Sequence, residues 1–459
     1  MTESPHPQRT QPLPLNLPLS DLRVISKTPR LRVDPPQPCN PEWMHLTGLW
    51  RQSDFRKLWA GQAISQLGSS ITACGLPLAA VLTLGASPVQ MGMLSGVSGA
   101  SVLGFGLFAG AWADRLRRRP ILIAADMGRA LVLGTIPLAA WIHRLTMGHL
   151  YLAAAVSAAL TVFFDVSYQA YLPSLVGPAN LMEGNSKLVL TESIAGVAGP
   201  GLTGVLTQLI TAPVAILADA VSFVCSAISL WMIRKPEPEP RSARAPQRRI
   251  GREIAEGLAA TWRDPILRAL SKRTAVASIF LGFFGSLYFL FAIRDLRLSA
   301  ALIGIIVSAG GAANLVGAFA AGRLVSRFGF GPTLIASAIA PGIGMLLLPL
   351  AHGSATACAA VLIAAQLCDV AWPVYSINET SLRQAITPDA LLGRVNAAMH
   401  LMFHGIWPLG ALAGGILAGA CGVRCAMLVG ALGFLLSNVW LVFSPIRRLR
   451  ALPSYSICF

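Results

Sequence analysis

Long apolar segments alternate with short polar ones along most of the chain. Each apolar segment runs for about 20 residues, the length at which an α-helix crosses a bilayer. None shows the strict alternation over about ten residues that marks barrel strands. The pattern predicts twelve membrane-spanning helices, over residues 57–84, 90–113, 120–142, 150–173, 188–210, 213–233, 272–293, 301–325, 332–350, 354–377, 395–420 and 424–443.

Polar segments divide this pattern into domains. The predicted domains are a tail at 1–50, a six-helix bundle at 51–233, a linker at 234–271, a second six-helix bundle at 272–445 and a tail at 446–459. The first tail is rich in proline and is predicted to be disordered, because it cannot bury a core. The linker combines alternating Pro and Glu with a basic run, and we expect an amphipathic surface helix near Arg252–Trp262.

Composition supports the same fold class. Apolar residues make up 54% of the chain and charged residues 12%, whereas soluble domains carry about 25% charged residues. Lipid admits spanning segments only as helices or closed barrels. We therefore predict an all-α polytopic membrane protein with twelve transmembrane helices.

The net charge of +16 would suggest a nucleic-acid partner in a soluble protein, but its distribution indicates membrane topology. Of the 36 Lys and Arg residues, 31 lie in or beside segments on one side of the predicted membrane, four lie on the other side and Arg129 lies within it. Basic residues stay on the cytoplasmic side. We therefore expect both termini in the cytoplasm, electrostatic attraction to membrane lipids and no nucleic acid.

An internal repeat relates the two predicted bundles. The sequence Gly110-x-x-x-Asp114-Arg115 recurs 212 residues later as Gly322-x-x-x-Ser326-Arg327. Asp165 and Tyr168 recur as Asp369 and Trp372, and Gly196-x-x-x-Pro200 has a counterpart in Gly405-x-x-Pro408. The repeat predicts pseudo-symmetric bundles, which usually enclose a binding site at their interface near the bilayer midplane.

Several motifs make the chain resemble the major facilitator superfamily over about residues 50–445. Gly110, Asp114, Arg115 and Arg118 match its motif A, with Arg117 where glycine is usual, and Ser326 replaces the acid in the second copy. Gly196, Gly199, Pro200 and Gly204 resemble motif C of drug/proton antiporters. Further short matches resemble the enterobactin-exporter and macrolide-efflux branch: Asp54-Phe-Arg-Lys-Leu-Trp59, Asp126-Met-Gly-Arg-Ala130 and Leu392-Gly-Arg-Val-Asn396.

The resemblance implies roles for both motifs. Motif A is expected to be a conformational latch: Gly110 permits close helix packing, and Asp114 acts on the start of the eleventh helix near Arg394. The alternative is a solvated basic loop that only fixes topology. Motif C places Pro200 within a span, where it interrupts backbone hydrogen bonding, and its glycines favour tight packing. We expect a role in the conformational switch, or a simple packing kink.

Ionisable residues within spans are candidates for proton or substrate binding. They are Asp126, Arg129, Asp165, Glu192, Asp219 and Asp369. Asp126 and Arg129 share a helix face and are assigned to a cytoplasmic charge network. Asp165 and Asp369 lie on the fourth and tenth helices, which line the cavity in this family, each beside an aromatic residue, Tyr168 or Trp372. These two acids either serve the cavity or form structural ion pairs, and Glu192 and Asp219 either carry protons or are simply buried.

No constellation of an enzyme is present in the sequence. His400 and His404 have the spacing of two metal ligands on a helix, but no third ligand lies nearby, so we predict no metal and no cofactor. The sequence has no nucleotide-binding loop that would indicate transport driven by ATP.

The expected function is export of a small amphipathic molecule, a siderophore or a drug-like compound. We expect proton antiport by a monomer in the bacterial inner membrane, through alternating access. An importer of a siderophore or nutrient, a lysophospholipid flippase and a non-transporting sensor remain as alternatives.

Overall fold

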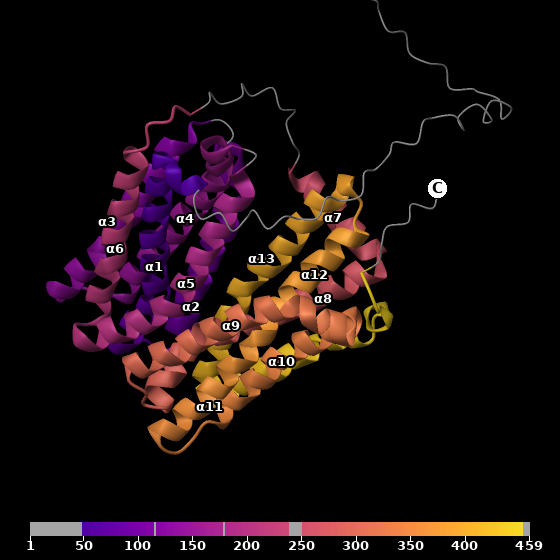
Figure 1. The fold of residues 1–459 in the computed structure, drawn as a ribbon. Helices are drawn as coiled ribbons and strands as arrows, with labels where there is room; N and C mark the ends of the chain where they lie inside the picture. Colours follow the sequence, from indigo (N-terminus) through magenta and orange to yellow (C-terminus); the bar gives the residue numbers. More distant parts are fainter. Residues whose placement is uncertain (1–47, 114–115, 178–179, 238–249, 453–459) are drawn as a thin grey trace, which may run out of the picture. The chain divides into compact units, whose positions relative to one another are not determined.

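The structure is a computed structural model that describes residues 48–113, 116–177, 180–237 and 250–452; at 107–113, 250–254 and 389–390 it describes the backbone alone. Most of the predicted tail 1–50 therefore lies outside the described residues. The described part belongs to one compact unit, Thr47–Phe459. It contains helices and no strand (Figure 1), which confirms the predicted all-α class.

Sixteen described helical segments lie within or beside the predicted spans. They are α1 (Ser53–Leu82), α2 (Pro88–Ala113), α3 (Arg118–Trp141), α4 (Met147–Val176), α5 (Leu181–Leu209), α6 (Ala212–Trp231), α8 (Pro265–Leu290), η6 (Phe291–Asp295), α9 (Ala300–Phe328), α10 (Phe330–Leu350), α11 (Ala355–Leu367), η7 (Cys368–Val370), α12 (Ala371–Ile386), α13 (Asp389–Cys421), α14 (Val423–Ser437) and α15 (Val439–Val442). The other described elements are η4 (Leu49–Arg51), α7 (Ile250–Arg263) and η8 (Pro445–Arg448).

Eleven spans among the described residues are long and apolar enough to cross a membrane, counting α8 with η6, α11 with η7 and α12, and α14 with α15 as single spans. The remaining predicted span, 90–113, corresponds to α2. The tenth predicted span is interrupted by the short helix η7, which contains Asp369. The chain is thus a multi-pass membrane protein.

Some helix boundaries differ from the prediction because polar caps extend the helices beyond their apolar windows. α8 begins at Pro265, inside the predicted linker, where the Asp264 side chain accepts hydrogen bonds from the backbone N–H groups of Ile266 and Leu267 at 2.8 and 2.9 Å. Aspartate followed by proline is a favoured helix start. The predicted amphipathic segment within the linker is helical, as α7.

The predicted tails also contain ordered residues. Leu49 is fully buried and its backbone N–H donates to Glu183 at 3.2 Å. After η8, the carbonyl oxygens of Leu449 and Arg450 accept from Gly331 and Phe330 at the start of α10. Both segments therefore cap or cover helix ends.

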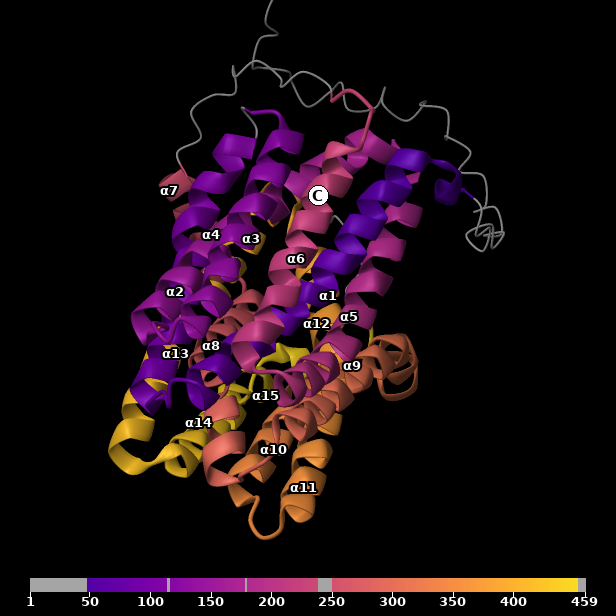
Figure 2. The same cartoon turned by 90° about the vertical axis from the view of Figure 1, so that its left-hand side faces the viewer.

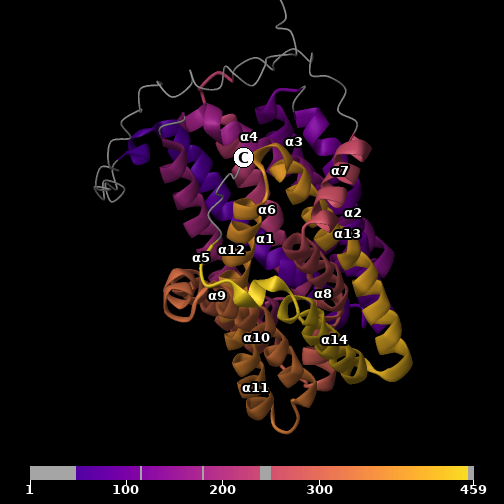
Figure 3. The same cartoon turned by 90° about the vertical axis from the view of Figure 1, so that its right-hand side faces the viewer.

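Two halves share the same arrangement of six spans: the first half is α1–α6 and the second half is α8–α14. We call the side on which residues 232–264 join the halves the linker side, and the opposite side the far side. Between the halves, α2 packs along α13 and α5 along α9 (Figure 2). The linker helix α7 packs on α13 (Figure 3).

Buried apolar side chains show how closely the halves approach at each side. On the far side, one cluster takes members from both halves, including Leu78, Leu133, Leu290 and Met427. On the linker side, each half has its own cluster, around Phe55 in the first and around Phe330, for example, in the second. Among the described residues, the halves therefore share an apolar cluster only on the far side.

Candidate functional site

Glycine residues on α2 and α13 define the contact between the halves. A Cβ atom on Gly92 would lie 2.7 Å from the Ala411 carbonyl oxygen, and one on Gly99 would lie 2.7 Å from the Pro408 ring. Farther along the same face of α2, a Cβ on Gly106 would have no described atom within 4 Å. The contact therefore ends midway along α2.

The second contact, between α5 and α9, ends in the same way. Gly204 lies against the backbone of Ala300, and a Cβ on Gly311 would lie 2.8 Å from the Gly196 carbonyl oxygen. Gly322, nearer the linker side of α9, has open space among the described atoms. The halves are therefore closed against each other on the far side and separate toward the linker side.

One cavity lies between the halves, and a second cavity lies beside it within the second half. The first, about 450 Å³, is lined by α1, α2, α4, α8 and α13, with residues that include Leu76, Leu94, Val102 and Trp407. The second, about 420 Å³, lies within the second half between α8, α12 and α13. Phe403 and His404 line both cavities, so the two are neighbours.

The second cavity is lined by charged residues. Arg273 of α8, with Glu379 and Arg383 of α12, lines its wall. Glu379 and Arg383 form an ion pair of 2.9 Å. This site was not predicted from the sequence, because Arg273 and Arg383 lie next to the basic residues of the neighbouring loops. Glu379, one helical turn before Arg383, is the residue that could have indicated a buried charged site in the sequence.

Motif C lies between the two halves. Gly199 of α5 faces Ser70 of α1, and the Thr203 hydroxyl donates to the Gly199 carbonyl at 2.7 Å. The backbone of Pro200 and Gly204 lies against Gly304 of α9. One face of the motif thus packs within its own half and the other contacts the second half.

Motif A is described only in part. Gly110 lies in α2 with its surroundings undescribed, and Asp114 and Arg115 lie outside the described residues. At the start of α3, the backbone N–H groups of Arg118 and Arg119 donate to the Glu237 carboxylate at 2.7 and 3.1 Å. Arg394, the expected neighbour of Asp114, forms an ion pair of 2.8 Å with Glu256 of α7.

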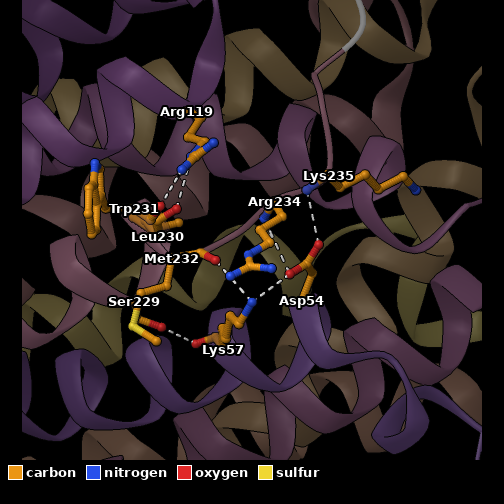
Figure 4. A network of polar contacts seen from close by, with 9 residues as sticks. All are labelled: Asp54, Lys57, Arg119, Ser229, Leu230, Trp231, Met232, Arg234 and Lys235. Atoms are coloured by element: carbon orange, nitrogen blue, oxygen red, sulfur yellow. Dashed lines mark hydrogen bonds and ion pairs between the residues drawn. The ribbon is translucent and has the colours of Figure 1, made fainter.

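A group of polar contacts, here the linker-side network, joins the start of the linker to the first half (Figure 4). Asp54 of α1 accepts from the backbone N–H groups of Arg234 and Lys235 at 3.4 and 3.0 Å. Lys57 donates to Asp54 and to the Met232 carbonyl, both at 2.9 Å. Arg119 donates to the final carbonyls of α6, including that of Leu230 at 2.9 Å. These bonds satisfy groups that a helix end leaves unpaired.

Asp126 and Arg129 form a buried ion pair on one face of α3. Asp126 is 0% exposed and Arg129 is 4% exposed. The Arg129 guanidinium lies 4.0 Å from the Phe223 ring centre and 4.5 Å from that of Phe164. All these contacts are within the first half. The charge of Arg129 is thus neutralised and stacked inside one bundle.

The other predicted acids of the first half have different surroundings. Asp219 of α6 is 1% exposed and accepts from the Ser222 hydroxyl at 3.0 Å. Asp165 of α4 and Glu192 of α5 are exposed within the described structure. Only the latter two are accessible to solvent or ligand.

Asp369, Trp372 and Tyr168 complete the predicted set. Asp369 is half-buried in η7, at the interruption between α11 and α12. Trp372 lines the second cavity. Tyr168 stacks on Phe164 with ring centres 5.8 Å apart and lines neither described cavity.

The two histidines of α13 stack with ring centres 4.7 Å apart. His400 lines the second cavity, and His404 lines both. Among the described residues, no group of three or more His, Cys, Asp or Glu side chains is placed to hold a metal ion. The prediction of no metal and no cofactor stays a prediction.

Comparisons with known proteins agree with this geometry. A model of the Major Facilitator Superfamily matches residues 58–411. Multidrug efflux pump Tap of Mycolicibacterium fortuitum is 27% identical over 359 residues, which cover 75% of this chain and 84% of that protein. Multidrug resistance protein MdtH of Sodalis glossinidius (strain morsitans) is 31% identical over 184 residues, which cover 39% of this chain and 41% of that protein.

Solved structures are similar in fold. The crystal structure of a bacterial homologue of iron transporter ferroportin in an inward-facing state gives a TM-score of 0.70 at 19% identity, and the match covers 86% of this chain and 98% of that chain. A structure described as outward-facing, also of a bacterial homologue of that transporter, gives a TM-score of 0.54 at 19% identity, with 85% and 98% covered.

Proposed function

The chain belongs to the Major Facilitator Superfamily, and from this premise we propose that it exports a small amphipathic molecule from the cytoplasm by proton antiport. The observation that carries the proposal is a cavity lined by both halves, with a second cavity beside it in the second half. Such sites at the interface of repeated halves are exposed alternately to the two sides of a membrane.

The proposed export direction draws on the basic residues, the shape of the interface and the similarity to efflux pumps. If basic segments stay inside, the linker side and both termini are cytoplasmic. The described form is then open to the cytoplasm and closed on the far side, so it is the form that loads cytoplasmic substrate. Similarity to multidrug efflux pumps supports a drug-like cargo, and a siderophore satisfies the same description.

The switch between states is assigned to the two motifs. Motif C, at Gly196, Gly199, Pro200 and Gly204, is the packing surface on which α5 moves against α9. Motif A, at Gly110, Asp114, Arg115 and Arg118, is the latch of the opposite state. In that state, with the linker side closed, Asp114 acts on the start of α13.

Proton coupling is assigned to exposed acids. Asp126 has its charge neutralised by Arg129, and Asp219 is enclosed, so both are assigned to structure. Asp165 and Glu192 are exposed, and Asp165 lies within range of the charges of Arg129 and Glu192. Uptake of a proton by such a carboxylate competes with substrate binding, which is the essential step of antiport.

A test uses inverted bacterial-membrane vesicles with a fluorescent drug-like dye as substrate. Wild-type protein should accumulate the dye when the vesicle interior is acid, and an ionophore that collapses the pH gradient should abolish the uptake. Asp165→Asn should lose gradient-driven uptake while it retains dye exchange without a gradient. Asp295→Asn, at the far-side end of η6, is the matched control and should behave as wild type.

Two results would contradict the proposal. Uptake that survives collapse of the gradient excludes proton antiport. Dye movement in the opposite direction in the same vesicles supports an importer.

A further inference from the structure

Arg273 is a buried cation that forms no ion pair with a carboxylate of the described residues. It is 4% exposed and lies within α8 rather than at its end. Its guanidinium lies 4.1 Å from the Tyr375 ring centre and 5.3 Å from that of Phe434, and its Nε donates to Asn438 at 3.3 Å. Nη2 has no acceptor among the described residues. A buried charge without an ionic partner is costly.

Arg129 provides an internal comparison. Both arginines are 4% exposed and each lies between two aromatic rings. Arg129 has Asp126 as its carboxylate. In the described second half, the carboxylate near Arg273 belongs to Glu379, which pairs with Arg383. The position that Asp126 occupies beside Arg129 therefore has no equivalent beside Arg273.

The surroundings of Arg273 favour an anion. Of the charged residues that line the second cavity, two are arginines and one is Glu379, so the lining carries one excess positive charge when the histidines are neutral. Three further buried polar groups of this lining have no hydrogen-bond partner among the described residues: Nε of Arg383, the Tyr375 hydroxyl and Oδ1 of Asn396. The first two can donate to an anion, whereas Oδ1 of Asn396 is an acceptor and needs a donor. Native proteins leave few such groups unsatisfied, so each calls for a ligand or water.

The neighbouring first cavity fits an apolar group. Its lining includes Leu76, Leu94, Val102 and Trp407, with no Asp, Glu, Lys or Arg among the described lining residues. Phe403 and His404 line both cavities, so a ligand that extends past these two side chains would reach both. Its apolar body would lie in the first cavity and its charged end in the second.

We propose that the second cavity binds the anionic group of an amphipathic carboxylate, with the Arg273 guanidinium as its principal partner. This inference rests on the proposed function, because the carboxylate is taken to be part of the transported molecule. Charge-assisted hydrogen bonds from a guanidinium to a carboxylate are short and stronger than neutral ones. Arg273 thereby makes the site select anionic over neutral amphiphiles.

Binding of matched probes to the full-length protein tests the inference. The probes are dansylated undecanoic acid and its methyl ester, measured by fluorescence in phosphatidylcholine nanodiscs, with empty nanodiscs as the blank. Wild type should bind the acid at least about tenfold more tightly than the ester. Arg273→Gln should lose this preference and keep its affinity for the ester. Arg268→Gln, an exposed position on the same helix, is the control and should keep the preference.

A second variant keeps the test informative if Arg273→Gln does not fold. Asn396→Asp changes one atom of the cavity wall and adds a negative charge, so it should also remove the preference for the acid. Equal binding of acid and ester by wild type, absence of saturable acid binding, or an unchanged preference in Asn396→Asp would each overturn the inference. Retention of the preference in Arg273→Gln would do the same.

Two further experiments distinguish failure of the proposed anionic site from failure of the proposed export function. In nanodiscs that contain phosphatidylglycerol, a retained preference supports a free amphiphile, whereas its loss identifies a lipid headgroup as occupant and overturns the assignment to cargo. In inverted vesicles, gradient-driven uptake of the ester alone would leave the proposed export intact and refute the anionic site. Uptake of neither probe, with normal acid-selective binding, would count against export instead.

Discussion

The buried pair of Asp126 and Arg129 illustrates how single residues are held inside the first half. Each charge would be expensive alone, and the two together offset part of that cost. Stacking of Arg129 on Phe164 and Phe223 adds a cation–π contribution. The pair therefore contributes to the packing of α3 against its neighbours, whatever its role in transport.

Removal of one member should leave an uncompensated buried charge. We expect Arg129→Met to lower the free energy of unfolding by about 3–5 kcal/mol, seen as a lower unfolding temperature in detergent. The double variant Asp126→Leu with Arg129→Met should recover most of that loss. A stable double variant that no longer transports dye would show that the pair takes part in transport and does not only stabilise the first half.

Sequence could identify some of these residues and not others. Arg129 and Asp126 interrupt a long apolar run, so their burial was predictable. Arg273 is the second residue of the predicted span 272–293 and follows a basic linker, so the sequence indicated a flanking residue at the membrane surface rather than a buried one. Arg273 is buried because α8 begins early, at Pro265 with Asp264 as its cap, so that Arg273 lies inside the helix and within the second half.

At the scale of elements, small residues set how closely α2 approaches α13. Gly92 and Gly415 allow their backbones to meet, which is how glycines act in membrane helix pairs. The same face of α2 continues to Gly106, where contact has ceased. One helix face thus serves as a contact on the far side and as open surface nearer the linker side.

Bulk added at the contact should disturb this form of the protein, whereas bulk added beyond it should not. Gly92→Val places atoms against the Ala411 carbonyl, and overpacking of this kind costs about 1–3 kcal/mol. We expect Gly92→Val to lower the unfolding temperature of the protein in detergent. Gly106→Val is the matched control, and equal effects of the two variants would contradict the described contact.

The elements themselves were largely predictable, because apolar length marks spanning helices. The interruption at η7 and the polar linker-side network were not. Both depend on which backbone groups find partners after folding, as the capping of α3 by Glu237 shows. The resemblance placed motif C on a spanning helix. It did not predict that the motif contacts two helices, α1 in its own half and α9 in the other.

For the whole molecule, the arrangement of the apolar clusters determines which contacts must break when the halves move relative to each other. The halves share an apolar cluster on the far side and have separate clusters on the linker side. Opening the far side would require this shared cluster to divide. The internal repeat predicted two related halves, but sequence carries no information on which state is more populated, since both states use the same residues.

A reversible cross-link on the far side should trap the described form. A Cβ on Gly419 would lie 3.3 Å from Cγ2 of Val89, close to the separation that a disulfide requires. In a background without other cysteines, Val89→Cys with Gly419→Cys should cross-link under oxidation and stop dye uptake, and reductant should restore it. Val89→Cys alone is the control. Full uptake by the cross-linked protein would show that the far side need not open.

The linker-side network fixes the start of the linker to the first half, and α7 fixes its end to α13. Residues 238–249 connect these two anchored segments. A fully extended chain of that length reaches roughly 40 Å. This length limits how far one half can move relative to the other. Deletion of residues within 238–249 would therefore restrict that movement without changing any residue that lines the cavities.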